Sequence, residues 1–410
     1  MSEYMMAVQN GRNVPKEDKI FGISSRAKAM IDEKGAEAVI NATIGTLLND
    51  DGELMVLSSV DDTFSSLSPE EYASYAPIGG IPAYKTAAIK AALGRYQPKG
   101  YVEAVATPGG TGAIRNTIAN YSAPGDKVLT GDWHWSPYGT IASEIGRSID
   151  TFTLFTEERK FNIEDFRAKV EALLSVQDHL VIILNTPAHN PTGYALTDED
   201  WKQVTACLAA IGQDKKAALL IDAAYIDFAG DEEKYRSFLP IVEELPANVL
   251  PIIAYSMSKT FTIYGMRTGA AICMAKTKEI AEEFKRVCEF SARGSWSNCA
   301  RAGQSIIAKI FADEKLLARV TEERKEIRDM LLARGRAFEE EAAKAGLEIV
   351  PFDAGFFVSI PCDNPDEVSA RLEQEGIFLV PLARGLRVSV ASISEEKCRI
   401  LPEKILAAMK

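Results

Sequence analysis

The sequence predicts a three-layer α/β domain with a mostly parallel sheet, together with a smaller α+β domain. Short apolar runs alternate with helix-like segments from about residue 55 to residue 300, which is typical of a parallel sheet with helices on both faces. After residue 300 a long helical stretch leads into short strands set off by glycine or proline. The 410 residues also exceed one ordinary hydrophobic core, which favours two units.

The larger unit takes its strands and helices from the alternating region. Apolar runs predict strands at residues 128–130, 181–184, 219–221, 252–255 and 270–274. Segments with helical periodicity predict helices at residues 163–174 and 198–211.

The smaller unit follows a helical stretch, rich in Glu, Arg and Ala, that runs through residues 322–344. Its predicted strands are GLEIVPF, GFFVSIP, GIFLVPL and GLRVSVA, at residues 346–352, 355–361, 376–382 and 385–391. Residues 39–43 add a further strand from the N-terminal side.

Composition excludes several classes of protein. A net charge of −12 argues against a nucleic-acid or anionic-membrane partner, since both require a basic surface. The six cysteines are scattered without a CxxC pair, so we expect no disulfide scaffold or zinc site. The start lacks the pattern of a signal peptide, and no apolar run reaches 18 residues. We therefore expect a cytoplasmic protein with free thiols and no metal.

Three polar residues follow predicted strands. Asn190 comes shortly after VIIL, Asp222 directly after LLI, and Lys259 soon after IIAY. Ligands of parallel α/β sheets bind beyond the carboxyl ends of the strands. Any one of these residues alone fits an ordinary loop, but an amide, a carboxylate and an amine in this order predict a site.

The stretch GGTGAIRNTIANY, residues 109–121, predicts a helix start. Taken alone, it fits an ordinary structural helix start as well as it fits an anion site. No Gly-Lys-Ser/Thr follows, so it is not a P-loop, and Arg115 stands where a dinucleotide fingerprint needs its third glycine. Ser256-x-x-Lys259 also matches the S-x-x-K of penicillin-recognising enzymes, but the chain has no Lys-Thr-Gly.

A lysine, a carboxylate and an anion site together match the chemistry of pyridoxal 5′-phosphate (PLP). Its aldehyde forms a Schiff base with a lysine amine, for which Lys259 is the candidate. Its ring nitrogen needs a carboxylate to stay protonated, which Asp222 can provide. Its phosphate needs backbone donors and a cation, for which the candidates are Gly110, Thr111, Ser256 and Arg267.

The motifs NATIGTLLNDDGE, YAPIGGIPAY, TPGGTGAIRN, HNPTGYALT, IDAAYIDFAG, SMSKTFTIYGMRTGA, RGSWSN and RGLRVSVA extend over most of the chain. With them the sequence resembles the class I (fold-type I) PLP-dependent aminotransferases, and most closely their aspartate aminotransferase-like subgroup. The resemblance implies a homodimer with shared active sites and three parts: an N-terminal arm with part of the small domain (1–50), a large PLP-binding domain (51–315) and a small domain (316–410). Residues 14–30 resemble the arm that crosses to the partner.

The resemblance also implies a role for each matching residue around the cofactor. Lys259 holds the cofactor and moves the proton at the substrate Cα. Asp222 pairs with the ring nitrogen, while Tyr225 and Asn190 hydrogen-bond the ring oxygen. Trp135 stacks on the ring face. The phosphate is held by Gly110, Thr111, Ser256 and Arg267, with Tyr75 reaching in from the other subunit.

The substrate-binding roles fall on three further positions. Arg387 grips the substrate α-carboxylate in a bidentate fork, a geometry that suits arginine better than lysine. Gly45 lies near the substrate. Arg293, in ARGSWSN, stands where dicarboxylate-specific members place an arginine for the distal carboxylate of the neighbour's substrate; the alternative is a solvated arginine at a helix end.

The chain departs from the family pattern at three places, which bear on substrate preference. Thr46-Leu47-Leu48 replaces the usual Tyr-Arg after the glycine, and Cys299-Ala300 replaces prolines. Tyr138 takes the place of a histidine that normally supports the aspartate.

The predicted function is transfer of an amino group from an L-amino acid, with aspartate favoured, to 2-oxoglutarate by a ping-pong mechanism. The alternatives within the cofactor class are an aromatic-amino-acid aminotransferase and a PLP-dependent β-lyase. A nucleotide-dependent oxidoreductase is a more remote alternative, and the stretch GGTGA is the only feature that favours it. A sensing domain attached to a DNA-binding segment is disfavoured by the acidic composition.

Overall fold

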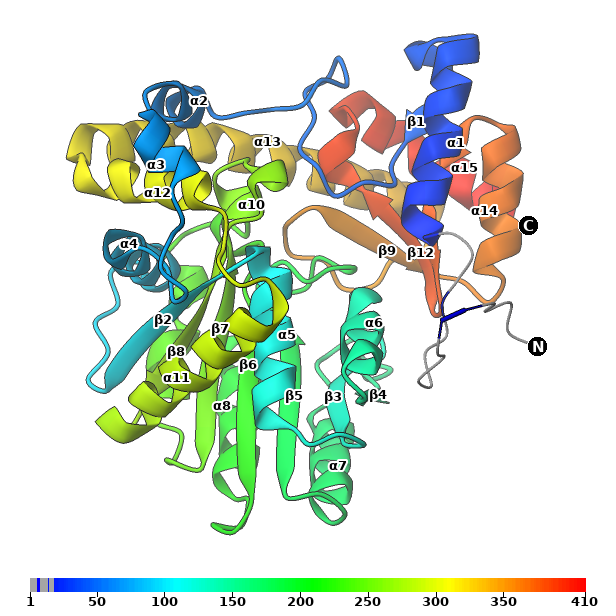
Figure 1. Cartoon of the computed structure of the whole chain (residues 1–410). Coiled ribbons are helices and arrows are strands. Elements are labelled where there is room, and N and C mark those ends of the chain that lie inside the picture. Colours follow the sequence, from blue (N-terminus) through cyan, green and yellow to red (C-terminus); the bar gives the residue numbers. More distant parts are fainter. Residues whose placement is uncertain (1–5, 8–13, 15–17) are drawn as a thin grey trace.

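The computed structural model describes residues 6, 7, 14 and 18–410. Within these residues the larger unit is built on a seven-stranded sheet of order β2-β8-β7-β6-β5-β3-β4 (Figure 1). Strand β8 pairs antiparallel with β2 and β7, and the other pairs are parallel. The strands are β2 (Tyr101–Thr107), β3 (Lys127–Gly131), β4 (Ser148–Phe152), β5 (His179–Asn185), β6 (Lys216–Asp222), β7 (Val249–Ser256) and β8 (Gly269–Ala275).

The predicted strands of this sheet are confirmed as parts of β3, β5, β6, β7 and β8. They were recognisable because strands covered by helices on both faces form continuous apolar runs. Strands β2 and β4 were not predicted. Strand β4 lies at the sheet edge and only its last residue, Phe152, is buried, so it has little apolar signal.

Helices cover both faces of the sheet. One face packs against α5 (Gly109–Tyr121), α6 (Pro137–Glu144) and α11 (Lys278–Ser295). The other face packs against α4 (Pro82–Leu93), α7 (Ile163–Leu174), α8 (Asp198–Ala209) and α9 (Phe238–Glu243). The helix predicted at residues 163–174 is confirmed, and the one at 198–211 ends two residues earlier than predicted. The three-layer α/β class is therefore confirmed.

The smaller unit contains an antiparallel sheet of order β11-β12-β9 and a parallel pair, β1 with β10. These strands are β1 (Ile40–Asn41), β9 (Phe357–Pro361), β10 (Ile377–Phe378), β11 (Val380–Leu382) and β12 (Gly385–Ser389). Helices α1 (Lys19–Lys34), α14 (Pro365–Gln374) and α15 (Glu395–Met409) pack against them.

Two strand predictions in this unit were wrong in detail. Residues 346–352 form no strand: Val350 donates to the Ser359 carbonyl (2.8 Å), but Pro351 has no amide hydrogen with which to continue the ladder. The single strand predicted at 376–382 is interrupted at Leu379, and its two halves belong to different sheets.

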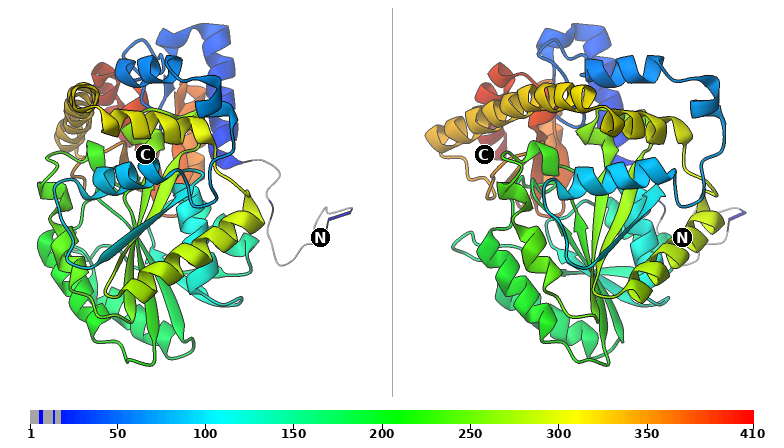
Figure 2. Two further views of the ribbon diagram at one scale, coloured as in Figure 1. Left: turned by 60° about the vertical axis from the view of Figure 1, so that its left-hand side comes forward. Right: turned by 90° about the vertical axis from the view of Figure 1, so that its left-hand side faces the viewer.

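Helix α13 (Glu314–Ala345) contributes to both cores. Its first part buries Val320 and Leu331 in the large core, and its last part buries Phe338 in the small core. It begins eight residues before the predicted stretch, where the Asp313 side chain caps it by accepting from two backbone amides. The predicted boundary between the large and the small domain, at residue 316, lies within this helix, which spans both cores (Figure 2). The boundary therefore stays a prediction.

The predicted arm, residues 14–30, falls partly on residues 15–17, which lie outside the described residues. Its remainder belongs to α1, which buries Ile23 and Ala27 against Val39 and Phe378 of the same chain. None of the described helices is both long and apolar enough to cross a bilayer. Among the described residues, no group of three or more His, Cys, Asp or Glu side chains is placed to hold a metal ion.

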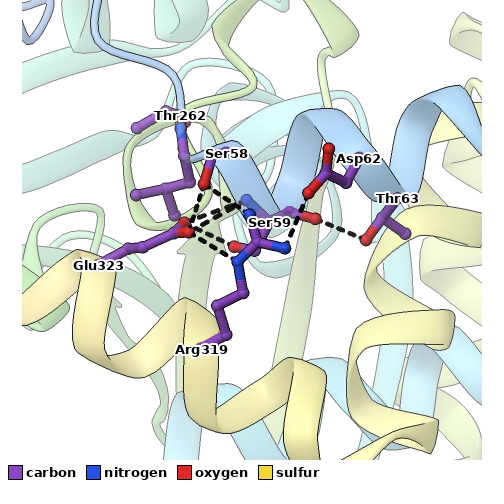
Figure 3. Close-up of polar contacts among 8 residues, drawn as sticks. Ser58, Ser59, Asp62, Thr63, Thr262, Arg319 and Glu323 are labelled. Carbon is purple, nitrogen blue, oxygen red and sulfur yellow. Dashed lines mark hydrogen bonds and ion pairs between the residues drawn. The ribbon is translucent and has the colours of Figure 1, made fainter.

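Helix α2 (Ser58–Ser65) begins at a cap supplied by another helix (Figure 3). Leu57 at the cap position has no side-chain acceptor, and the Glu323 carboxylate of α13 replaces it. Glu323 accepts from the Ser58 and Ser59 hydroxyls at 2.6 Å and from the Ser59 amide at 3.2 Å. The Leu57 amide donates to the Thr262 hydroxyl at 2.9 Å, so α2 is also tied to the loop after Lys259.

We predict that Glu323→Ala lowers the free energy of unfolding by about 1 to 2 kcal/mol, because it removes this cap. Burial raises the pKa of Glu323, but hydrogen bonds from Ser58 and Ser59 and the charge of Arg319 outweigh it and hold that pKa below its usual value. The difference in the free energy of unfolding between wild type and variant should be largest above about pH 4.3, the ordinary glutamate pKa. It should disappear as the pH falls through the lower pKa that Glu323 has in the folded protein.

Urea denaturation of both proteins between pH 7 and pH 3 checks this prediction. Glu326→Ala, at an exposed position of the same helix, is the control and should change stability by less than about 0.5 kcal/mol. Equal effects of the two substitutions would show that Glu323 is no cap.

Candidate active site

A cavity of about 200 Å³ lies at the carboxyl ends of β5, β6 and β7 and at the start of α5. A larger cavity of about 490 Å³ lies between α7 and α8, but none of the predicted site residues lines it. The residues that the sequence predicted and that line the smaller cavity are Gly110, Thr111, Trp135, Asn190, Asp222, Tyr225, Ser256, Lys259 and Arg267.

Lys259 belongs to the single-turn helix α10 (Met257–Thr260), which follows β7 directly. Ser256 ends the strand, and its hydroxyl accepts from the Ser258 amide at the start of that turn. The Lys259 amine lies 5.1 Å from the centre of the Tyr225 ring. Burial lowers the pKa of the Lys259 ammonium to about 8; the Asp222 carboxylate raises this pKa and the Arg267 guanidinium lowers it. The amine is therefore partly neutral near neutral pH.

Asp222 ends β6 and presents one free carboxylate oxygen. The Tyr138 hydroxyl, on α6, donates to Oδ2 at 2.5 Å. The other oxygen, Oδ1, is buried and has no hydrogen-bond partner among the described residues. Burial raises the pKa of Asp222, whereas the Tyr138 hydrogen bond and the Lys259 charge lower it. A buried acceptor without a partner indicates that a donor belongs in the cavity.

Asn190 joins Tyr225 to Arg387. Its amide nitrogen donates to the Tyr225 hydroxyl at 3.3 Å, and its amide oxygen accepts from Arg387 Nη1 at 3.2 Å. Arg387, on β12, also donates to the Thr43 carbonyl at 2.8 Å and lies 4.3 Å from the Phe357 ring centre. Its Nε is buried without a partner among the described residues. Burial lowers the pKa of this guanidinium to about 10.

The first turn of α5 and Arg267 form an anion site. No side chain caps α5, so the amides of its first turn, which include those of Gly110 and Thr111, point along the helix dipole into the cavity. Gly109 has φ +69°, and a Cβ there would lie 2.5 Å from Arg267 Nη2, so only glycine fits. Arg267 is held in place by donating to the Ser258 hydroxyl at 3.1 Å.

Four predicted residues do not line the cavity. One of them, Arg387, contacts it only through Asn190, which does line it. Tyr75 is 89% exposed, and Arg293 is an exposed residue that donates to the Ser297 hydroxyl at 2.6 Å. Gly45 packs on Phe357: a Cβ there would lie 2.5 Å from the ring. Because Phe357 also contacts Arg387, Gly45 lies beside the Arg387 end of the site.

Sequence reasoning missed two contributors. Asn185 lines the cavity, donates to the Asp222 carbonyl at 2.7 Å and accepts from the Asn190 amide at 2.5 Å. In the sequence, Asn185 could have been recognised as a polar residue directly after the apolar run VIIL. Tyr138 was noted as a departure but not as a site residue, although its hydroxyl is the partner of Asp222.

These groups fit the polar ends of PLP. The free oxygen of Asp222 suits a protonated ring nitrogen, and the start of α5 with Arg267 suits a phosphate. The amine of Lys259, with its lowered pKa, suits an aldehyde.

Comparisons with known proteins agree with this assignment. The sequence matches the family model described as "Aminotransferase class I and II" over residues 37–405. An aspartate aminotransferase of Salmonella typhi is 28% identical, over 96% of this chain and 98% of the relative. An aromatic-amino-acid aminotransferase of Pseudomonas aeruginosa is 26% identical, over 83% of this chain and 86% of the relative.

A solved structure is similar over the whole length. The crystal structure of an aminotransferase from Anaerococcus prevotii has a TM-score of 0.96 and 38% identity, and the alignment covers 99% of this chain and 100% of that one. The match extends over both units and over every element that lines the cavity. The chain therefore belongs to the class I and II aminotransferases and is a PLP-dependent aminotransferase of the aspartate or aromatic type.

Proposed function

We propose that this enzyme transfers the amino group of an L-amino acid, preferably aspartate, to 2-oxoglutarate by a ping-pong mechanism. The observation that supports it best is the buried guanidinium of Arg387, which donates to the cavity-lining Asn190 and whose Nε has no partner among the described residues. Such a group binds a carboxylate in a bidentate fork and holds the α-carboxylate that amino acids and 2-oxo acids share.

The chain's own residues hold the cofactor and move the proton. Lys259 is the attachment site, Asp222 holds the ring nitrogen, and Tyr225 with Asn190 holds the ring oxygen. When bound, PLP supplies the electron sink that stabilises negative charge at the substrate Cα. The Lys259 amine then takes the Cα proton as general base, a role for which its pKa of about 8 is suited.

The remaining cofactor contacts are proposed for the phosphate and the ring face. Gly110, Thr111, Ser256 and Arg267 hold the phosphate, and Trp135 stacks on the ring. Gly45 and Trp135 border the substrate.

A homodimer with shared sites is part of the proposal. Tyr75 and Arg293 do not line the cavity of their own chain and are exposed, as is Phe290, three residues before Arg293 on α11. Exposed aromatic residues are typical of protein–protein interfaces, and predicted site residues that do not line the cavity of their own chain are expected where two chains share a site. Tyr75 would then contact the phosphate, and Arg293 the distal carboxylate, in the partner's site.

The aromatic substrates remain the second candidate, because relatives of both names match this chain about equally well. A β-lyase would use the same proton abstraction. Incubation with aspartate, tyrosine or cystathionine, each with 2-oxoglutarate, distinguishes the three by their products. We also propose a cytoplasmic location, which the six free cysteines favour.

Lys259→Ala should abolish turnover, because it removes both the attachment site and the base. Borohydride reduction of the wild-type holoenzyme followed by peptide mapping should place the label on Lys259. Turnover at the wild-type rate in the variant, or a label elsewhere, would refute the assignment.

Arg293→Asp should lower kcat/KM for aspartate by about 100-fold or more and that for phenylalanine by less than about threefold, since only aspartate has a distal carboxylate. Arg286→Asp, an exposed arginine of the same helix, is the control and should change neither. Equal losses for both substrates would remove the proposed role.

Mixing chains tests whether the site is shared. A dimer of one Lys259→Ala chain and one Arg293→Asp chain has one complete site if Arg293 serves the partner. Aspartate turnover should then reappear in the mixture. If it does not, Arg293 either acts in the site of its own chain or has no role in either site.

Tyr138→Phe should weaken PLP binding by about tenfold, with a larger loss at lower pH. Burial already raises the pKa of Asp222, and without the phenol that pKa rises further, so the carboxylate loses its charge over a wider pH range. Equilibrium titration of the apoprotein with PLP between pH 6 and pH 9 measures this. Tyr96→Phe, which breaks the hydrogen bond to Glu243 at a distance from the cavity, is the matched control and should bind PLP normally.

A further inference from the structure

Asp227 is the centre of a buried polar cluster next to the active site. We call it the Asp227 cluster; its members are Asp227, Arg236, Tyr255, Thr260 and Arg324. None of them lines the cavity. Two are nevertheless close along the chain to residues that do, since Asp227 follows Tyr225 by two positions and Thr260 follows Lys259 directly.

The two oxygens of Asp227 have different partners. Oδ2 accepts from the Tyr255 hydroxyl at 2.6 Å and from the Thr260 hydroxyl at 2.8 Å. Oδ1 accepts from Arg236 Nη2 at 2.8 Å, and Arg324 Nη1 lies 3.8 Å away. The cluster therefore connects β7, α10, the turn η3 (Lys234–Arg236) and α13 through one carboxylate.

The Asp227 cluster is buried and charged. The side chains of Asp227, Arg236 and Arg324 are 9%, 5% and 14% exposed, so water screens the interactions among them only weakly. Burial raises the pKa of Asp227, but Arg236 and Arg324 outweigh it and lower that pKa to about 2, so the group is an anion at neutral pH. Arg236 is itself anchored, since it donates to the Ala91 and Ala92 carbonyls at the end of α4.

The cluster fixes both ends of the segment that contains Lys259. Tyr255 precedes Ser256, and Thr260 follows Lys259, so the four residues between them are bounded by two hydroxyls that donate to the same oxygen. Asp227 in turn belongs to the turn η2 (Ile226–Phe228), which begins directly after Tyr225. The position of the Lys259 amine relative to Tyr225 therefore depends on these two hydrogen bonds.

We propose that Asp227, acting through Thr260, is a positioning residue that sets the Lys259 amine for proton transfer. The inference rests on the proposed role of Lys259. A misplacement of about 1 Å in a catalytic group can cost up to about 100-fold in rate, so loss of the anchor should affect kcat more than substrate binding. Arg387 and Arg293, the proposed substrate-binding groups, lie outside the cluster.

Thr260→Val tests the proposal with the least disturbance, because it removes one hydroxyl from Asp227 and keeps both the charge and the side-chain shape. Its matched variant, Thr260→Ser, keeps the hydroxyl. We expect Thr260→Val to lower kcat per bound cofactor by about tenfold with KM within about twofold of wild type, and Thr260→Ser to lose much less. Asp227→Asn should act in the same direction as Thr260→Val.

A second readout is independent of turnover. PLP added to each apoprotein should attach to Lys259 more slowly in Thr260→Val than in Thr260→Ser, as followed by visible absorbance and by borohydride trapping of the labelled peptide. Tyr194→Phe, which removes a phenol donating to Asp200 on α8, controls for the loss of a partly buried hydrogen bond and should leave both readouts unchanged.

The outcomes distinguish a failure of the proposed function from a failure of the proposed positioning role. If the wild-type label is not on Lys259, the proposed function fails. If it is on Lys259 but Thr260→Val and Asp227→Asn attach PLP and turn over at wild-type rates per bound cofactor, the positioning role is overturned. Equal losses in Thr260→Val and Thr260→Ser would also overturn it, because the hydroxyl would then be irrelevant.

Discussion

A half-buried lysine at the end of β7 is the constraint on which the rest of the site depends. An ammonium inside a protein is costly unless an anion offsets its lost hydration. Asp222 provides that anion, because β6 and β7 are parallel neighbours whose register pairs Asp222 with Ala254. Both strands therefore end at the same edge of the sheet. Arg267 acts in the opposite direction, and the amine is left with a pKa of about 8.

The smaller unit completes the site from the other side. Arg387 comes from β12, yet its hydrogen bonds reach Asn190, after β5, and Thr43, after β1. The fully buried Arg334 of α13 acts in a similar way, since it donates to the Leu48 and Ala391 carbonyls and pairs with Asp50. Two buried guanidiniums thus fix the segment 43–50 against the sheet of β12. This explains why Gly45, distant from Arg387 in sequence, lies beside it in the fold.

The sequence predicted the parts of this site that follow from strand ends. Asn190, Asp222 and Lys259 could be placed together because the ends of parallel strands converge. The roles of Arg387, Arg293 and Tyr75 came from the family resemblance. The position of Arg387 depends on the smaller unit, and the proposed roles of Arg293 and Tyr75 depend on a partner chain. The contact of Tyr138 with Asp222, and the convergence of residues 227, 236, 255, 260 and 324, could not be predicted. They join elements that are distant in sequence, and no local pattern specifies which side chains meet.

Asp222 and Asp227 show how one short loop makes two carboxylates different. They are five residues apart and both are buried. Burial raises both pKa values and prevails for Asp222, whereas for Asp227 the charges of Arg236 and Arg324, with the Tyr255 hydrogen bond, outweigh it. Both oxygens of Asp227 are used by protein donors, so it can only hold the surrounding structure together. Asp222 lines the cavity, and its Oδ1 accepts no hydrogen bond from the residues that the structure describes. Of the two, only Asp222 can gain a partner when a ligand binds, which agrees with its proposed contact with the cofactor and with the proposed positioning role of Asp227.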